Sequence, residues 1–160
     1  MESIYKSDVV IVGSGISGLM TAISLYPRKV TLVTKRKLGE MSSSAWAQGG
    51  IAAAVTKEDS PELHFKDTLK ASSGLSDELA VKIITNDAKD IVDFLESIGV
   101  QFDKFNGEFS LSKEAAHSHR RVLKINGDQS GKYLVEFLMK HLKKQGHATI
   151  VEDVSVDHII

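Results

Sequence analysis

The fold of this chain is decided by one stretch near its start: Asp8-Val9-Val10-Ile11-Val12-Gly13-Ser14-Gly15-Ile16-Ser17-Gly18. Its first part, residues 8–12, is an apolar run rich in β-branched side chains, which is typical of a strand buried on both faces. Residues 19–25 have helical composition and end near Pro27, and a second β-rich run covers residues 30–34. A strand, a glycine turn, a helix and a strand within about thirty residues predict a βαβ unit, and therefore an α/β fold.

The glycines of this turn have the spacing Gly-x-Gly-x-x-Gly. Gly13 permits a tight turn, Gly15 lets the backbone approach a pyrophosphate, and Gly18 lets helix and strand pack closely. The start of the helix adds N–H groups and the positive end of the helix dipole. The turn therefore predicts a dinucleotide site over residues 13–18, with a glycine-rich turn that binds no ligand as the alternative.

The acidic residue that binds the ribose in NAD-dependent dehydrogenases is missing about twenty residues further on. Val33-Thr34-Lys35 stands at that point, and Glu40 comes later. A lysine side chain cannot accept the proton of a ribose hydroxyl. Either the backbone binds the ribose here, or the turn serves a flavin nucleotide.

Composition excludes several classes of function. The 160 residues include 20 Lys plus Arg against 21 Asp plus Glu, a formal net charge of −1, so charge gives no reason to expect nucleic acid or an anionic membrane as a partner. The absence of cysteine excludes disulfides, thiolate metal sites and a cysteine nucleophile. There is no apolar run of about 18 residues for a transmembrane helix, and the polar start does not resemble a secretory signal. We therefore expect a cytoplasmic protein.

The rest of the chain alternates between helical and β-rich patterns. Helices are predicted over residues 61–72, 78–97 and 131–144, and a hairpin is predicted around Asn106-Gly107. Further strands are predicted over residues 51–55, 121–125, 148–151 and 154–160.

Two other segments are candidates for binding. Small residues in series from Ser42 to Ala54 allow backbone N–H groups to press against a planar or charged ligand; a flexible surface loop is the alternative. The segment from Glu114 to Arg121 combines two histidines, two arginines and a carboxylate, which could meet an anionic substrate or form a solvated basic stretch. His117 and His119 lack a third ligand at a usual spacing, so no metal site is predicted.

Three motifs together resemble the L-aspartate oxidases, in the flavoprotein group that contains succinate dehydrogenase and fumarate reductase. They are Val10-Ile11-Val12-Gly13-Ser14-Gly15-Ile16-Ser17-Gly18-Leu19, Ala47-Gln48-Gly49-Gly50-Ile51-Ala52 and Glu114-x-x-His117-Ser118-x-Arg120-Arg121. The resemblance implies an incomplete Rossmann-like FAD-binding domain of the GR2 type, with the start of an inserted α+β capping domain. Residues 1–160 would be the N-terminal part of the FAD-binding domain, and the capping domain would lie mainly beyond residue 160.

The resemblance also implies how FAD is held. Gly13, Ser14, Gly15, Ile16, Ser17 and Gly18 would surround the pyrophosphate, and Lys35 matches the lysine that this family carries after its second strand. The residues implied to line the flavin are Ser43, Ser44, Ala45, Trp46, Ala47, Gln48, Gly49 and Gly50, with Ser155 and Val156 at the adenosine end. Membrane-linked members carry a histidine that bonds covalently to the flavin where this chain has Ser43, so FAD is expected to be non-covalent.

The implied reaction is the oxidation of L-aspartate to iminoaspartate, with oxygen or fumarate as the final electron acceptor. Quinolinate synthase would use the product in NAD biosynthesis. Glu114 would face the substrate ammonium, which succinate lacks, and His117, Ser118 and Arg120 would lie in the substrate region without an assigned chemical role.

Two departures limit what the resemblance implies. Ala115-Ala116 stands where many members of the family have two glycines. L-aspartate oxidases are also several-fold longer, and their acid–base arginine has no counterpart here, so we expect the isolated chain to be inactive. The alternative is a truncated FAD- or ADP-binding remnant that serves as an interaction module. An NAD(P)-linked dehydrogenase is disfavoured.

Overall fold

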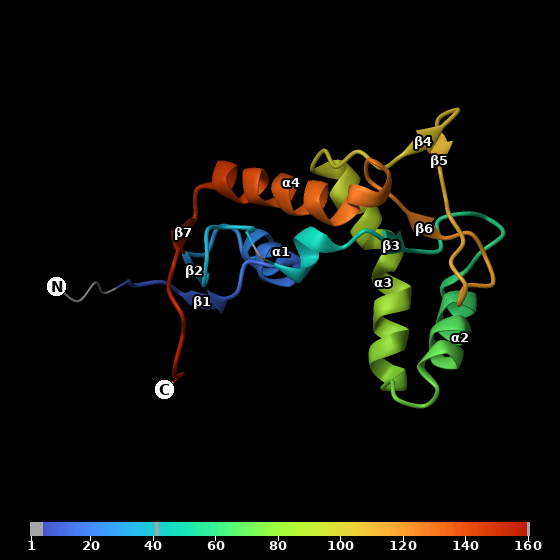
Figure 1. The fold of residues 1–160 in the computed structure, drawn as a ribbon, viewed down its shortest axis with the longest axis horizontal. Helices are drawn as coiled ribbons and strands as arrows, with labels where there is room; N and C mark the ends of the chain where they lie inside the picture. Colours follow the sequence, from blue (N-terminus) through green and yellow to red (C-terminus); the bar gives the residue numbers. More distant parts are fainter. Residues whose placement is uncertain (1–4, 41, 160) are drawn as a thin grey trace. The chain divides into compact units, whose positions relative to one another are not determined.

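The computed structural model describes residues 5–40 and 42–159. The chain divides into two compact units, one formed by Met1–Ala47 with Gly131–Ile160 and the other by Gln48–Ser130. In Figure 1 the blue and red parts of the chain make up the first unit, and green and yellow parts make up the second. The chain therefore leaves the first unit after the glycine turn and its second strand, and returns to it later.

The first unit contains a parallel sheet of three strands in the order β1-β2-β7. These strands are β1 (Val9–Val12), β2 (Val30–Val33) and β7 (Ala148–Val151). Val9 is aligned with Val30, and Val30 with Ala148. Helix α1 (Ile16–Ser24) connects β1 to β2, so the predicted βαβ unit and the α/β class are confirmed.

Apolar side chains from both kinds of element form the core of this unit. Buried side chains of α1, the sheet and α4 (Ser130–Gln145) include Leu19, Ile23, Ile11, Leu32, Leu138 and Leu142. The chain after α4 is tied to α1, because the ring Nε2 of His147 lies 2.9 Å from the carbonyl oxygen of Ala22.

Strand β1 differs from the prediction of a strand buried on both faces. Ile11 is 9% exposed, whereas Val10 is 62% and Val12 is 56% exposed. β1 is the edge strand, and no described element covers its second face, whereas β2 lies between two strands and is buried for most of its length.

The second unit is built around two helices, α2 (Pro61–Ser72) and α3 (Glu78–Ser97). Ser60 caps α2 by accepting the N–H of Leu63, and Asp77 caps α3 in the same way at Ala80. Two short antiparallel pairs complete the unit: β3 (Ile51–Ala52) with β6 (Val122–Leu123), and β4 (Lys104–Phe105) with β5 (Glu108–Phe109). The predicted helices and the hairpin are confirmed.

The predicted strand over residues 154–160 is wrong for its described part. Residues 154–159 have no regular structure, and residue 160 lies outside the described residues. After the N–H of Val154 bonds to the carbonyl of Thr34, the segment has no strand partner in the described chain. The strands expected over residues 51–55 and 121–125 shorten to two residues each. None of the helices in the described residues is long and apolar enough to cross a membrane.

Candidate functional site

The glycine turn joins β1 to α1 with little room for side chains. Gly13 has a φ of +108°, a backbone conformation that residues other than glycine rarely adopt. Its N–H donates to the carbonyl of Val33 at 2.9 Å. A Cβ added to Gly18 would lie 2.0 Å from the carbonyl oxygen of Gly13. The turn and the first turn of α1 are therefore in direct backbone contact.

Helix α1 starts without a charge that offsets its dipole. Its N-cap is Gly15, which offers no side-chain hydrogen bond, and its first turn has no acidic residue. The N–H of Ile16 bonds instead to the hydroxyl of Ser44, at 3.2 Å. A helix start of this kind attracts an anion.

A hollow of about 580 Å³ lies at this turn. Its lining comes from the turn, the end of β2 and the following loop: Gly13, Ser14, Gly15, Thr34, Lys35, Arg36, Glu40, Ser42, Ser43 and Ser44. The lining includes two cationic side chains and one carboxylate, and the backbone of the turn borders it directly. These residues fit the phosphate groups of a dinucleotide.

The loop on the far side of the hollow is fixed by short-range and long-range contacts. The 3₁₀ turn η1 (Ser43–Trp46) begins after Ser42, whose hydroxyl accepts the N–H of Ala45 at 3.2 Å. The N–H of Gly131, in the first turn of α4, donates to the carbonyl of Ala47 at 3.0 Å. A Cβ on Gly131 would lie 2.1 Å from the carbonyl oxygen of Ser44.

Gly131 was not among the residues predicted for the site. The sequence signal for it was only a glycine that opens a helix after the Asn126-Gly127 turn, and nothing local shows that the loop 43–47 packs there.

The remaining predicted cofactor residues are distributed over both units. Lys35 borders the hollow, whereas Ser155 and Val156 lie in the exposed segment after β7 and do not line it. Gln48, Gly49 and Gly50 belong to the second unit. The close approach at Gly50 explains its residue type, since a Cβ there would lie 2.0 Å from the carbonyl oxygen of Leu123.

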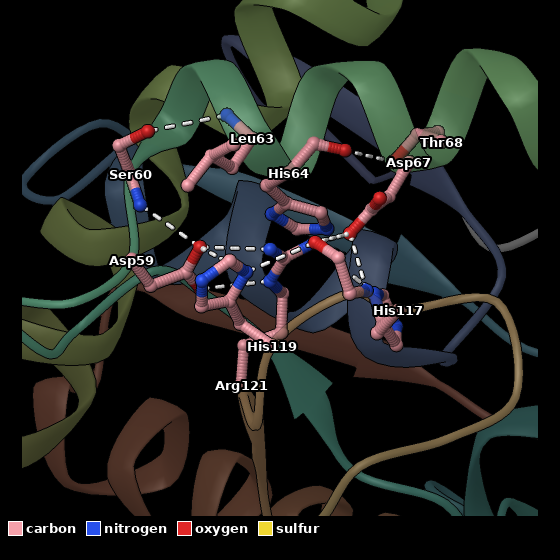
Figure 2. Close-up of polar contacts among 10 residues, drawn as sticks. Asp59, Ser60, Leu63, His64, Asp67, Thr68, His117, His119 and Arg121 are labelled. Atoms are coloured by element: carbon pink, nitrogen blue, oxygen red, sulfur yellow. Dashed lines mark hydrogen bonds and ion pairs between the residues drawn. The ribbon is translucent and has the colours of Figure 1, made fainter.

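The second unit contains a buried ionic cluster formed by Asp59, Asp67 and Arg121, shown in Figure 2. The side chain of Arg121 is 0% exposed. Its Nε and Nη2 donate to the two carboxylate oxygens of Asp59, at 2.8 and 2.7 Å, and its Nη1 donates to Oδ2 of Asp67 at 2.7 Å. A bidentate pair of this kind fixes both distance and orientation.

The cluster stabilises both carboxylates in the ionised form. Burial raises the pKa of Asp67, but the N–H and hydroxyl of Ser118 and the guanidinium of Arg121 outweigh it and lower the pKa to about 2. Burial also raises the pKa of Asp59, and Arg121 and the N–H of Ser60 bring it below its ordinary value. In both residues hydrogen bonds to the charged form prevail over desolvation.

The cluster holds the segment that was predicted for the substrate region. Both the N–H and the hydroxyl of Ser118 donate to Oδ2 of Asp67, at 2.7 Å each. His117 Nδ1 lies 3.3 Å from Nη1 of Arg121, and its ring packs edge-on against His64, with the centroids 5.6 Å apart. Figure 2 shows Asp67, His64 and His117 around the guanidinium.

Arg121 itself corrects one prediction. It was interpreted as a cation for an anionic substrate or as part of a solvated stretch, but it is fully buried and paired with carboxylates of its own chain. The preceding residue, Arg120, is exposed, and so is Glu114. Glu114 lies near a second predicted residue, since a Cβ on Gly49 would be 3.9 Å from its Oε1.

Burial also affects a histidine that sequence reasoning did not connect with the site. His64, on α2, is 6% exposed, and its Nδ1 has no hydrogen-bond partner among the residues that the structure describes. Desolvation, followed by the charge of Arg121, lowers the pKa of His64, so its ring is neutral near pH 7. Within residues 5–40 and 42–159, no group of three or more His, Asp or Glu side chains is arranged to hold a metal ion.

The fold and the hollow define a nucleotide-binding α/β protein, and comparison with known proteins identifies its family. The FAD binding domain family matches residues 8–160, so the chain belongs to this family. This match confirms FAD as the cofactor.

Relatives of similar sequence are L-aspartate oxidases. The enzyme of Xylella fastidiosa strain Temecula1 is 40% identical over 157 residues, which are 98% of this chain and 31% of that protein. The enzyme of Agrobacterium fabrum is 45% identical over 94% of this chain and 29% of its own length. The predicted resemblance is confirmed, and the chain spans less than a third of the length of these relatives.

Solved structures support the fold. Sdh1 of Mycobacterium smegmatis, solved in complex with UQ1, superposes with a TM-score of 0.84 and 26% identity over 93% of this chain and 28% of its own. A variant of FrdA from the E. coli quinol fumarate reductase gives a TM-score of 0.84 at 23% identity, over 91% of this chain and 26% of its own, which shows the shared fold alone. The predicted fold class is confirmed, and the position of a capping domain stays a prediction.

Proposed function

We propose that the protein is an FAD-dependent L-aspartate oxidase and that this chain forms its N-terminal, FAD-binding part. The observation that carries this proposal is identity of 36–45% to enzymes of that name over nearly the whole chain. The hollow at the glycine turn, with its cationic lining, independently supports the FAD-binding part of the proposal.

The residues of the first unit would bind FAD without a covalent bond. The backbone of Ser14 and Gly15 and the start of α1 would hold the pyrophosphate, with Lys35 beside it. Ser43 has no imidazole to bond to the flavin. Bound FAD would supply the oxidant that takes up hydride from the substrate.

The residues of the second unit would select the substrate. Glu114 is an exposed carboxylate beside Gly49, and a carboxylate attracts the ammonium group of L-aspartate. The same charge repels succinate, which carries two carboxylates and no ammonium. An interaction available to only one of two similar substrates gives specificity.

We also propose electron acceptors for this function and an enzyme that uses its product. Oxygen or fumarate would accept the electrons, and quinolinate synthase would consume the iminoaspartate on the way to NAD. These reactions would place the protein in the cytoplasm.

A second candidate function is an FAD- or ADP-binding module without catalysis. One observation favours it: all the residues that line the hollow at the glycine turn belong to the first unit.

Oxygen consumption by the complete gene product, loaded with FAD, tests the choice of substrate. We expect turnover with L-aspartate and none with succinate. Glu114→Gln should lower kcat/KM for L-aspartate by about tenfold to a hundredfold, the range expected when a charged hydrogen bond is lost. Lys113→Gln, which changes a neighbouring exposed charge, is the matched control. Equal rates with succinate in the unaltered protein would contradict the proposal.

A further inference from the structure

The hydrogen-bond donors of Arg121 determine where the proton lies on His117. A guanidinium has only donors and no acceptor. Nη1 of Arg121 lies 3.3 Å from Nδ1 of His117, so that Nδ1 must be the acceptor and carries no proton. The neutral ring then carries its proton on Nε2. The ring of His64, which packs edge-on against His117, is neutral.

The same reasoning gives the opposite result for His119. Asp67 is ionised, so it can only accept, and the single hydroxyl proton of Ser118 must point to its Oδ2 at 2.7 Å. Two oxygens at that distance without a proton between them would repel each other. The hydroxyl oxygen of Ser118 must therefore accept from Nδ1 of His119, which lies 2.9 Å away. A carboxylate oxygen of Asp59, 3.9 Å from the same Nδ1, favours a proton there.

We propose that the Asp59–Arg121–Asp67 cluster fixes opposite tautomers of two histidines, so that His117 offers an Nε2–H donor and His119 an Nε2 acceptor to an α-amino acid substrate. Both rings are partly exposed. An α-amino acid carries an acceptor, its carboxylate, beside a donor, its ammonium, and can use both rings. A simple dicarboxylate has acceptors only.

This inference deepens the proposed function and rests on it for the identity of the substrate. The tautomers themselves depend only on the cluster and on the hydroxyl of Ser118. Asp67 and Ser118 are positioning residues, because they act on the rings and are not assigned contact with the substrate.

The ¹⁵N NMR spectrum of histidine side chains reads the tautomers directly. We would record it on the FAD-loaded protein labelled with ¹⁵N-histidine, at a pH near 8, and assign the signals with His117→Gln and His119→Gln. We expect a protonated Nε2 in His117 and a protonated Nδ1 in His119. The same tautomer in both rings, or a mixture of tautomers in either ring, would overturn the proposal.

Removal of the Ser118 hydroxyl should change the tautomer of His119 and leave that of His117 unchanged. In Ser118→Ala, His119 loses the acceptor of its Nδ1 proton and should shift toward the Nε2–H tautomer that free histidine prefers, while His117 keeps its signals. Ser118→Thr retains the hydroxyl and should restore the original spectrum. Ser97→Ala, which removes an exposed hydroxyl elsewhere in the second unit, is the matched control. An unchanged His119 in Ser118→Ala would contradict the assignment.

Ligand addition tests the role in recognition. L-Aspartate should shift the Nε2 signals of both rings, whereas succinate should shift His117 alone. In the complete gene product, Ser118→Ala should raise KM for L-aspartate about tenfold, with FAD affinity unchanged. If neither ring responds to L-aspartate, the pair does not bind the substrate. A protein that shows these tautomers but does not oxidise L-aspartate would overturn the proposed function and leave the cluster's effect on the rings intact.

Discussion

Two glycines allow close backbone contacts beside the nucleotide hollow, Gly18 with the glycine turn and Gly131 with the loop 43–47. A side chain on Gly18 would collide with the carbonyl of Gly13, and a side chain on Gly131 would collide with the carbonyl of Ser44. Neither position has the positive φ that requires glycine for backbone reasons. Both are therefore fixed by close approach of backbone to backbone.

Gly18→Ala should push α1 away from the turn. We expect it to lower the free energy of unfolding by about 1–3 kcal/mol, as overpacking does, and to abolish retention of FAD during gel filtration. Ser24→Ala, at an exposed position of the same helix, should leave both measurements unchanged. Full FAD retention by Gly18→Ala would show that the turn does not contribute to the cofactor site.

Gly131→Ala should act on the loop and spare the helix. Alanine is a better helix former than glycine, so any weakening must come from displacement of residues 43–47. We expect about tenfold weaker FAD binding, measured by quenching of flavin fluorescence, while the far-ultraviolet circular dichroism stays the same. Lys132→Ala, the exposed next residue, should bind FAD like the unaltered protein.

At the scale of elements, α2 and the segment 117–121 are joined through Asp67. Its carboxylate accepts from Arg121 and twice from Ser118, so one side chain links a helix to the chain that leads into β6. Asp59 supports the same guanidinium from the loop before α2. Removing one carboxylate leaves the buried guanidinium of Arg121 paired with a single carboxylate.

The stability that Asp67 contributes should depend on pH. Its pKa is about 2 in the folded protein against an ordinary value of 3.8, so its contribution is fully present well above pH 3.8 and is lost as the pH falls through about 2. We expect Asp67→Asn to lower the free energy of unfolding by about 2 kcal/mol at pH 7, and by much less at pH 2.

Urea unfolding at the two pH values measures this difference. Glu62→Gln, at an exposed position of α2, is the control and should show little effect at either pH. A loss that is equal at both pH values would mean that the charge of Asp67 does not stabilise the fold.

The elements that could be predicted from the sequence are those with local signals. The βαβ unit follows from one apolar run and its glycines, and Ser60-Pro61 and Asp77 mark the helix starts within a few residues. The cluster could not be predicted, because the partners of Arg121 lie 62 and 54 positions away in the chain. An arginine next to another arginine looks exposed until those partners are known. The strand expected over residues 154–160 was wrong because β-rich composition does not supply a neighbouring strand.

At the scale of the whole molecule, the nucleotide hollow and the residues proposed for substrate recognition fall on different units. The nucleotide hollow belongs to the first unit, and the Arg121 cluster with Glu114 belongs to the second. The chain corresponds to less than a third of the L-aspartate oxidases that it resembles. We therefore expect the 160-residue chain to retain FAD but not to reduce it.

The most direct measurement is the visible absorption spectrum of the FAD-loaded complete gene product, recorded without oxygen before and after addition of L-aspartate. Loss of the oxidised flavin bands with L-aspartate, but not with succinate, is the result expected of an L-aspartate oxidase. Bands that persist with L-aspartate, or that disappear equally with succinate, would contradict the proposed function.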